Sequence, residues 1–142
     1  NNVILSNSVQ VAGHVIIEDC AIVGGCLGIH QFVHIGYLSM IGGMTRVTRD
    51  VPPFCLAEGS PGRLRGLNKV GIKRSGLIDT NNLNFKLLLH TWLLLFKSDY
   101  VISDAVEVAM SQELDFSSKR LCEFVKDSIS SNRRGPMPVG NS

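Results

Sequence analysis

The histidines of this sequence are the side chains best suited to acid–base chemistry near neutral pH, because a free imidazole has a pKa of about 6.5. There are four of them, at positions 14, 30, 34 and 90. A histidine could act as a general base or as a zinc ligand. On the residues alone, structural roles are the more common outcome, with His14 as a surface residue on a flat face and His30 as a hydrogen-bonded corner residue. We interpret His34 and His90 as structural.

A run of basic residues offers a second kind of chemistry. Residues 63–74, RLRGLNKVGIKR, carry five basic side chains and no acidic one. Such a run is commonly a solvated loop and helix face, but it could equally be a docking surface for phosphate or for an acidic protein. The formal net charge of +2 is too small to indicate a nucleic-acid partner.

The four cysteines form neither a CxxC pair nor a zinc-like cluster. We therefore predict no metal site, no disulfide framework and an intracellular, reducing compartment. No signal peptide is visible. The longest apolar run, Leu87 to Phe96, is interrupted by His90 and Thr91 and is shorter than the roughly 20 residues that a membrane span needs. We read it as a buried helix of a soluble protein.

A six-residue repeat predicts the scaffold that must position these side chains. Every sixth residue of the first part is aliphatic, namely Leu5, Val11, Ile17, Val23, Ile29, Ile35, Ile41 and Val47. The residue after each is mostly small or glycine. A period of six fits neither a helix nor an ordinary strand. It predicts a triangular prism of short stacked strands, with the aliphatic side chains inside and small residues near the sharp corners.

Prolines and charge divide the rest of the chain. The repeat stops at residues 50–53, DVPP, where the prolines cannot donate to a strand ladder. We predict the C-terminal coils of a left-handed parallel β-helix over residues 1–57, a basic exit loop and connecting segment over 58–78, a helical domain over 79–134 and a disordered tail over 135–142. Apolar spacing predicts helices over 84–97, 103–113 and 117–130. Because the repeat is already running at Leu5, we expect further coils before it.

The sequence resembles the UDP-N-acetylglucosamine acyltransferase family, hexapeptide-repeat enzymes that open lipid A biosynthesis. The matching segments are VAGHV at 11–15, GG at 24–25, HQF at 30–32, IGG at 41–43, DVPPF at 50–54, AEG at 57–59, GLN at 66–68 and KR at 73–74. The resemblance is dense from Asn1 to about Leu77 and thin afterwards.

This resemblance implies transfer of a fatty acyl chain, in most members a 3-hydroxyacyl chain, from acyl carrier protein to the 3-hydroxyl of UDP-N-acetylglucosamine. It implies a homotrimer with active sites between neighbouring prisms, and no cofactor. By matching position, Gly13 would donate a backbone N–H to the oxyanion. His14 and His30 would position the substrate, and Gln31 would contact the nucleotide sugar.

Three further positions take roles from the resemblance, and two departures limit it. Asn68 and Arg74 would hold the diphosphate, and Gly43 would lie at the floor of the acyl groove. The general-base histidine of the family falls before Asn1, so we expect this chain to lack it and to be inactive alone. Ser75 stands where the best-known bacterial members have a second arginine, which weakens the predicted phosphate clamp.

Three alternatives stay open at the level of sequence. A zinc enzyme of the carbonic anhydrase type could use His14, His30 and His34, although His30 and His34 differ by four in a period of six and so face different ways. A sister acyltransferase could act on an amine or use a coenzyme A donor. A non-catalytic, truncated subunit could still trimerise or bind acyl carrier protein. The resemblance implies the cytoplasm for a bacterial protein and the mitochondrion for a plant one.

Overall fold

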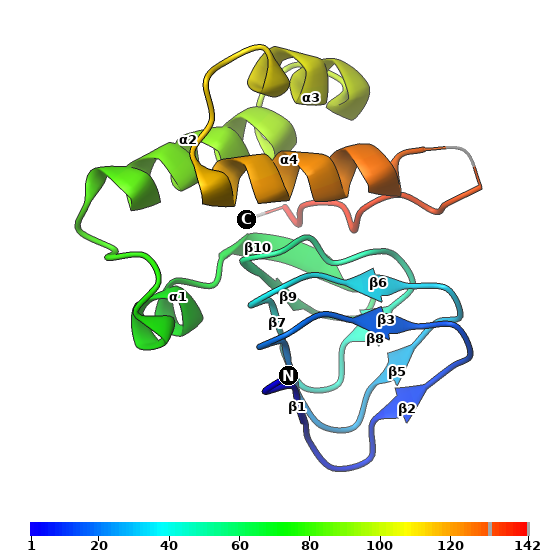
Figure 1. Cartoon of the computed structure of the whole chain (residues 1–142). Helices are drawn as coiled ribbons and strands as arrows, with labels where there is room; N and C mark the ends of the chain where they lie inside the picture. The colour runs from blue at the N-terminus through cyan, green and yellow to red at the C-terminus, as the bar shows by residue number, and fades with distance from the viewer. Residues whose placement is uncertain (131, 142) are drawn as a thin grey trace.

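The first third of the chain forms a prism of short strands. The computed structural model describes residues 1–130 and 132–141. Eight two-residue strands follow one another at intervals of six residues: β1 Ile4–Leu5, β2 Gln10–Val11, β3 Ile16–Ile17, β4 Ile22–Val23, β5 Gly28–Ile29, β6 His34–Ile35, β7 Met40–Ile41 and β8 Arg46–Val47. Figure 1 shows them as coils stacked from the N-terminus upward. The predicted hexad repeat is confirmed.

The strands assemble into three parallel sheets. Sheet A contains β1, β4 and β7, sheet B contains β2, β5 and β8, and sheet C contains β3 and β6. Strands β1 to β5 each pair with the strand 18 residues later, as Leu5 with Val23 and Val23 with Ile41. One turn of the prism therefore takes three hexads. The inward side chains form a continuous core, in which Val23, Ile35 and Ile41 are fully buried.

The corners of the prism differ from the sequence expectation. Small residues just after each aliphatic were expected at the sharp turns. Instead, the left-handed backbone conformation recurs three residues after the aliphatics from Leu5 to Ile41, and at Asn2 three before Leu5, at non-glycine positions: Asn2, Ser8, His14, Cys20, Cys26, Phe32, Leu38 and Met44. The small residues are needed because neighbouring coils approach closely there. A Cβ on Gly24 would lie 2.5 Å from the backbone nitrogen of Gly43 in the next coil.

The exit from the prism is more regular than expected. Strand β9, Cys55–Glu58, joins sheet A beside β7, and β10, Arg63–Leu67, pairs with it as an antiparallel hairpin. Strand pairing therefore continues beyond the prolines, into the segment expected to be an exit loop. The prolines precede β9 rather than standing in its ladder, which is why they do not end the sheet.

In the part of the chain that the structure describes, four helices follow the hairpin: α1 Lys69–Ser75, α2 Leu83–Phe96, α3 Ile102–Met110 and α4 Phe116–Ser128. The last three correspond to the predicted helices, with ends that differ by a few residues. The side chain of Asn82 caps the start of α2 by accepting a hydrogen bond from the Phe85 N–H. Gly76, with a φ of 70°, ends α1 in a left-handed conformation that suits glycine.

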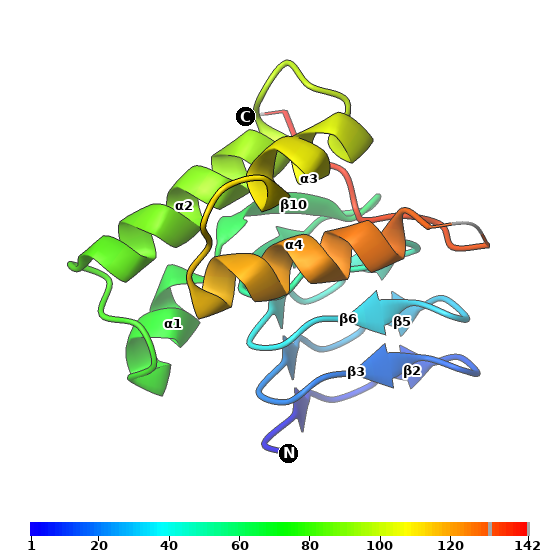
Figure 2. The ribbon, with the colours of Figure 1, turned by 45° about the horizontal axis from the view of Figure 1, so that its top comes forward.

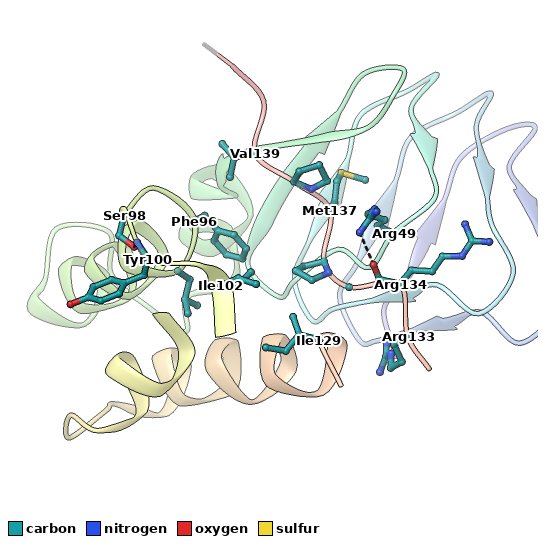
Figure 3. A pocket seen from close by; sticks show the side chains of 14 residues that line it. Arg49, Phe96, Ser98, Tyr100, Ile102, Ile129, Arg133, Arg134, Met137 and Val139 are labelled. Carbon is teal, nitrogen blue, oxygen red and sulfur yellow. Dashed lines mark hydrogen bonds between the residues drawn. The ribbon is translucent and has the colours of Figure 1, made fainter. Parts of the chain in front are cut away.

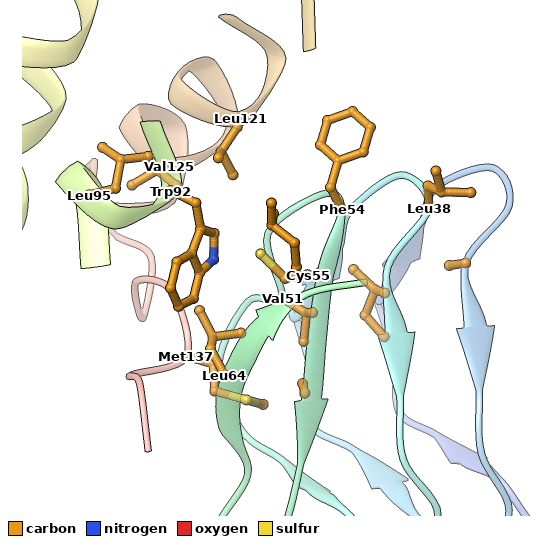
Figure 4. Close-up of a cluster of buried hydrophobic side chains, with 14 of the residues drawn as sticks. Leu38, Val51, Phe54, Cys55, Leu64, Trp92, Leu95, Leu121, Val125 and Met137 are labelled. Carbon is orange, nitrogen blue, oxygen red and sulfur yellow. The ribbon is translucent and has the colours of Figure 1, made fainter. Parts of the chain in front are cut away.

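The helices lie over one end and one side of the prism. Figure 2 shows α4 running across the upper coils, with α2 and α3 above it in this view. Figure 4 shows Trp92, Leu121 and Val125 of α2 and α4 facing Val51 and Leu64 of the prism. All five side chains are buried, so the prism core and the helical core are one continuous hydrophobic cluster.

The segment after α4 corrects the expectation of a disordered tail. Residues 135–141 run along the prism, where Met137 donates its N–H to the Asp50 carbonyl at 2.7 Å. Leu64 donates to Pro138, and Gly140 donates back to Leu64. The Met137 side chain is only 2% exposed. Burial of this one side chain and the backbone pairing together order a segment whose composition predicted disorder. Residue 142 lies outside the described residues.

The described part of the chain contains no helix that is both long and apolar enough to cross a membrane. The leucine-rich segment expected to be a buried helix is α2, which buries Phe85, Leu88, Trp92 and Leu95.

Candidate functional site

The outer face of sheet B is hollowed into a groove of about 470 Å³. Gln10, Gly28 and Arg46 stand above one another on this face, in consecutive coils. Gly28 leaves open space, because a Cβ placed there would have no neighbour within 4 Å. His30 and Arg46 also line the groove. The face therefore combines room for a ligand with cationic and imidazole side chains.

The corner between sheets B and C carries the predicted catalytic and positioning residues. The His14 ring stacks on Phe32 of the next coil, with ring centroids 5.0 Å apart and planes at 11°. A Cβ on Gly13 would come no closer than 3.7 Å to the Gln31 amide, so the backbone of Gly13 is open. The Gly13 carbonyl accepts from Phe32, but its own N–H donates to no backbone acceptor in the described residues. A free N–H at a groove edge is what oxyanion binding requires.

His30 follows β5 on the same corner, and both of its ring nitrogens have neighbours. Nδ1 lies 3.2 Å from the carbonyl oxygen of Gln31. Nε2 lies 3.3 Å from Nη2 of Arg134, which comes from the tail. No sequence pattern indicates this contact, because the two residues are 104 positions apart.

Gly43 lies on the opposite edge of the same face, at the corner between sheets A and B. A Cβ there would lie 3.4 Å from the carbonyl oxygen of Gly25 in the coil below. Because glycines occupy equivalent positions in these two coils, no side chain projects from this edge at either position. The structure thus places Gly13, His14, His30 and Gln31 along one edge of the sheet B face and Gly43 along the other.

Asn68 and Arg74 lie elsewhere in this chain. The Asn68 amide donates to the carbonyl of Leu38, which is at the corner between sheets C and A, opposite sheet B. Its oxygen accepts from the Gly71 N–H and caps α1. Asn68 is 4% exposed, so its contribution within this chain is to hold α1 in place. Arg74 is exposed in the last turn of α1. Direct contact of either residue with a diphosphate stays a prediction.

A polar network that sequence reasoning missed joins α4 to sheet C. Glu18 contacts Nε2 of His34 at 2.8 Å and Nη2 of Arg120 at 2.8 Å. The guanidinium of Arg120 lies over the Tyr37 ring, 4.1 Å from its centroid. Burial raises the pKa of Glu18, but its contacts with His34 and Arg120 outweigh burial and hold that pKa below the ordinary value. The network attaches the helical domain to the prism.

The three histidines of the zinc alternative do not converge within this chain. His14 and His30 lie at the corner between sheets B and C, whereas His34 belongs to sheet C and packs on Phe124 of α4, with ring centroids 4.7 Å apart. Among residues 1–130 and 132–141, no group of three histidine, cysteine, aspartate or glutamate side chains could hold a metal ion. His90 is exposed on α2.

A second hollow of about 470 Å³ lies where the tail meets the helices. Figure 3 shows its apolar side formed by Phe96, Ile102 and Ile129, and its other side formed by Arg49 and Arg134. Because Arg134 also contacts His30, this hollow and the groove on sheet B share one cationic boundary.

Comparison with known proteins agrees with this arrangement. Residues 50–137 match the family model described as "Udp N-acetylglucosamine O-acyltransferase; Domain 2". A curated acyl-[acyl-carrier-protein]–UDP-N-acetylglucosamine O-acyltransferase of Synechocystis sp. is 43% identical over 97% of this chain and 49% of its own length. A curated protein of the same description from Nautilia profundicola is 39% identical over 90% of this chain and 48% of its own length.

Solved structures give the same relationship. The UDP-N-acetylglucosamine acyltransferase from Campylobacter jejuni has a TM-score of 0.85 at 33% identity, covering 99% of this chain and 52% of that one. The Arabidopsis UDP-N-acetylglucosamine acyltransferase has a TM-score of 0.88 at 30% identity, covering 96% of this chain and 49% of that one. The likeness confirms the predicted left-handed parallel β-helix with C-terminal helices. The chain spans about half the length of the relatives it matches, and it belongs to the UDP-N-acetylglucosamine O-acyltransferase family.

Proposed function

We propose that this protein transfers a fatty acyl chain from acyl carrier protein to the 3-hydroxyl of UDP-N-acetylglucosamine, the first step of lipid A biosynthesis. The observation that supports it most is the groove on sheet B, which His30 lines and whose adjoining corner carries His14 and the open Gly13 N–H. The curated relatives carry the name of this activity. No cofactor is required, since the donor arrives as a thioester on acyl carrier protein.

In this proposal each site residue has a separate role that follows from its position. The Gly13 N–H donates to the oxygen that becomes negative as the acceptor hydroxyl attacks the thioester. His14 and His30 position the acceptor, and Gln31 contacts the nucleotide sugar. The acyl chain extends across the sheet B face toward Gly43, where the absence of a side chain leaves room. The base that removes the hydroxyl proton is assigned to none of the four histidines in these 142 residues.

The placement of Asn68 and Arg74 supports a homotrimer. These residues lie beside the corner opposite sheet B, so α1 cannot reach the groove of its own prism. A neighbouring prism packed against sheet B could bring its own α1 to the groove, where Arg74 would hold the diphosphate. In a bacterium the protein would work in the cytoplasm, and in a plant it would work in the mitochondrion.

A matched pair of substitutions at Gly13 tests the activity. His14 has a φ of 57°, as at the third position of a type II turn, and the position before it accepts proline. Gly13→Pro therefore removes the N–H while keeping the turn, whereas Gly13→Ala keeps the N–H and has room for its Cβ. Acyl transfer is followed by mass spectrometry on the trimeric protein purified from its source, with 3-hydroxyacyl donor on acyl carrier protein.

We expect Gly13→Pro to lower kcat by about 10²–10³-fold and Gly13→Ala to change it by only a few fold. Undiminished transfer by the proline variant would remove Gly13 from the mechanism. Absence of transfer by the unaltered protein would refute the proposed function and favour the non-catalytic subunit. A coenzyme A donor that works as well as acyl carrier protein would instead favour the sister acyltransferase.

A further inference from the structure

The tail after α4 brings a guanidinium to the groove on sheet B. Gly135 accepts from the Asp50 N–H, and Met137 donates to the Asp50 carbonyl, so the tail is paired on both sides of Pro136. Gly135 has a φ of 83°, a conformation that glycine adopts readily. Arg134, directly before this glycine, is therefore held at the prism by the backbone rather than free in solvent.

Two contacts fix where the Arg134 side chain and backbone lie. Its carbonyl accepts from Nη1 of Arg49 at 2.6 Å, the dashed line in Figure 3. Its Nη2 lies 3.3 Å from Nε2 of His30. A guanidinium can only donate, so Nε2 of His30 must accept and the ring hydrogen must be on Nδ1, which faces the Gln31 carbonyl. Arg134 thereby selects one tautomer of a predicted substrate-positioning residue.

The charges around Arg134 are not balanced locally. Arg133, its neighbour, pairs with Asp50 and Asp127. Within the described residues, neither Arg134 nor Arg49 has a carboxylate at ion-pair distance. A guanidinium has five N–H donors, of which His30 occupies one. The remaining donors, beside a second uncompensated arginine, are suited to the oxygens of a phosphate.

We propose that Arg134 is a further substrate-binding residue, which takes a phosphate of a substrate at the His30 end of the groove and holds the His30 ring in its Nδ1–H form. This inference rests on the proposed function. Both proposed substrates carry the required group, the nucleotide sugar as a diphosphate and the donor as the phosphate of its phosphopantetheine arm. Arg74 is on α1 at another corner, so Arg134 and Arg74 act on separate groups or from separate subunits.

Calorimetric titration of the purified protein with three probes distinguishes the sources. The probes are UDP-N-acetylglucosamine, 4′-phosphopantetheine and pantetheine, which lacks the phosphate. Arg134→Gln is compared with Lys126→Gln, which removes the same charge from an exposed position of α4. We expect Arg134→Gln to weaken one or both phosphate-bearing probes by about tenfold or more and to leave pantetheine unchanged. Lys126→Gln should bind all three probes with the same affinity as the unaltered protein.

A spectroscopic signature separates binding from a merely structural effect. In ¹⁵N-labelled protein, the His30 ring should show the Nδ1–H tautomer, and Arg134→Gln should shift it toward a mixture of both. Equal affinities in Arg134→Gln and the unaltered protein would overturn the inference while leaving the proposed function intact. Equal losses for pantetheine and phosphopantetheine would also overturn it. If the unaltered protein binds neither UDP-N-acetylglucosamine nor phosphopantetheine, the proposed function is refuted, and the inference that rests on it is refuted as well.

Discussion

The close approach of successive coils at Gly24 can be tested by a single methyl group. In Gly24→Ala, the new Cβ would lie 2.5 Å from the nitrogen of Gly43 and 2.8 Å from the carbonyl carbon of Gly42. Both neighbours are backbone atoms, which cannot rotate away as a side chain could. Overpacking of this kind costs about 1–3 kcal/mol.

Gly28→Ala is the matched control, because it adds the same methyl group in the same prism. Its Cβ would have no neighbour within 4 Å. Replacing a strand glycine with alanine should stabilise the fold by about 0.5–1 kcal/mol, since the unfolded chain loses freedom. Gly24→Ala reduces the freedom of the unfolded chain in the same way, so the two variants should differ by the overpacking cost alone, about 1–3 kcal/mol in the free energy of unfolding.

Thermal unfolding followed by circular dichroism measures this difference. For a chain of this size, 1 kcal/mol corresponds to about 4 °C in Tm, so Gly24→Ala should unfold about 4–12 °C below Gly28→Ala. The same order should appear in denaturant midpoints. Equal Tm values for the two variants would refute the idea that small residues at this position are required by coil spacing.

Two further predictions concern titratable groups. Burial raises the pKa of Glu18, but contacts with His34 and Arg120 lower it by a larger amount. The folded pKa is therefore below the unfolded value of 4.5. The stability due to Glu18 is then present above pH 4.5 and is lost as pH falls through the folded pKa. The difference in unfolding free energy between the unaltered protein and Glu18→Gln should therefore disappear in acid. A difference that does not change with pH would contradict this. Burial raises the pKa of the Cys55 thiol to about 12, whereas Cys26 is exposed. At pH 8, Ellman's reagent should therefore modify Cys26 promptly and reach Cys55 only on unfolding, and prompt modification of Cys55 in the folded protein would show that the core is more open.

The prism could be predicted from sequence because its signal is local and repeated. Each hexad places one aliphatic side chain in the core, and eight consecutive matches leave little choice of architecture. The position of the corners could not be predicted in the same way. Residues such as Phe32 and Leu38 rarely adopt positive φ, so nothing in their type indicates a turn.

The parts that sequence reasoning missed depend on residues distant in the chain. Glu18 and Arg120 are 102 positions apart, and His30 and Arg134 are 104 apart. Neither pair has a motif, and each forms only because the helices and the tail fold back over the prism. The tail itself has a weak local pattern, and its order depends on burial of Met137. Residues of the candidate site could be named from resemblance, but their distribution over three corners required the structure.

The register of 18 residues between stacked strands restricts how this scaffold can change in length. A deletion of one or two residues within a coil would move every later inward side chain out of the interior. Removal or duplication of a whole turn would leave all three faces aligned and would shorten or lengthen each by one strand spacing, about 4.8 Å. Natural variation in prism height should therefore occur in complete turns, and the reach of the sheet B face should vary in the same discrete increments.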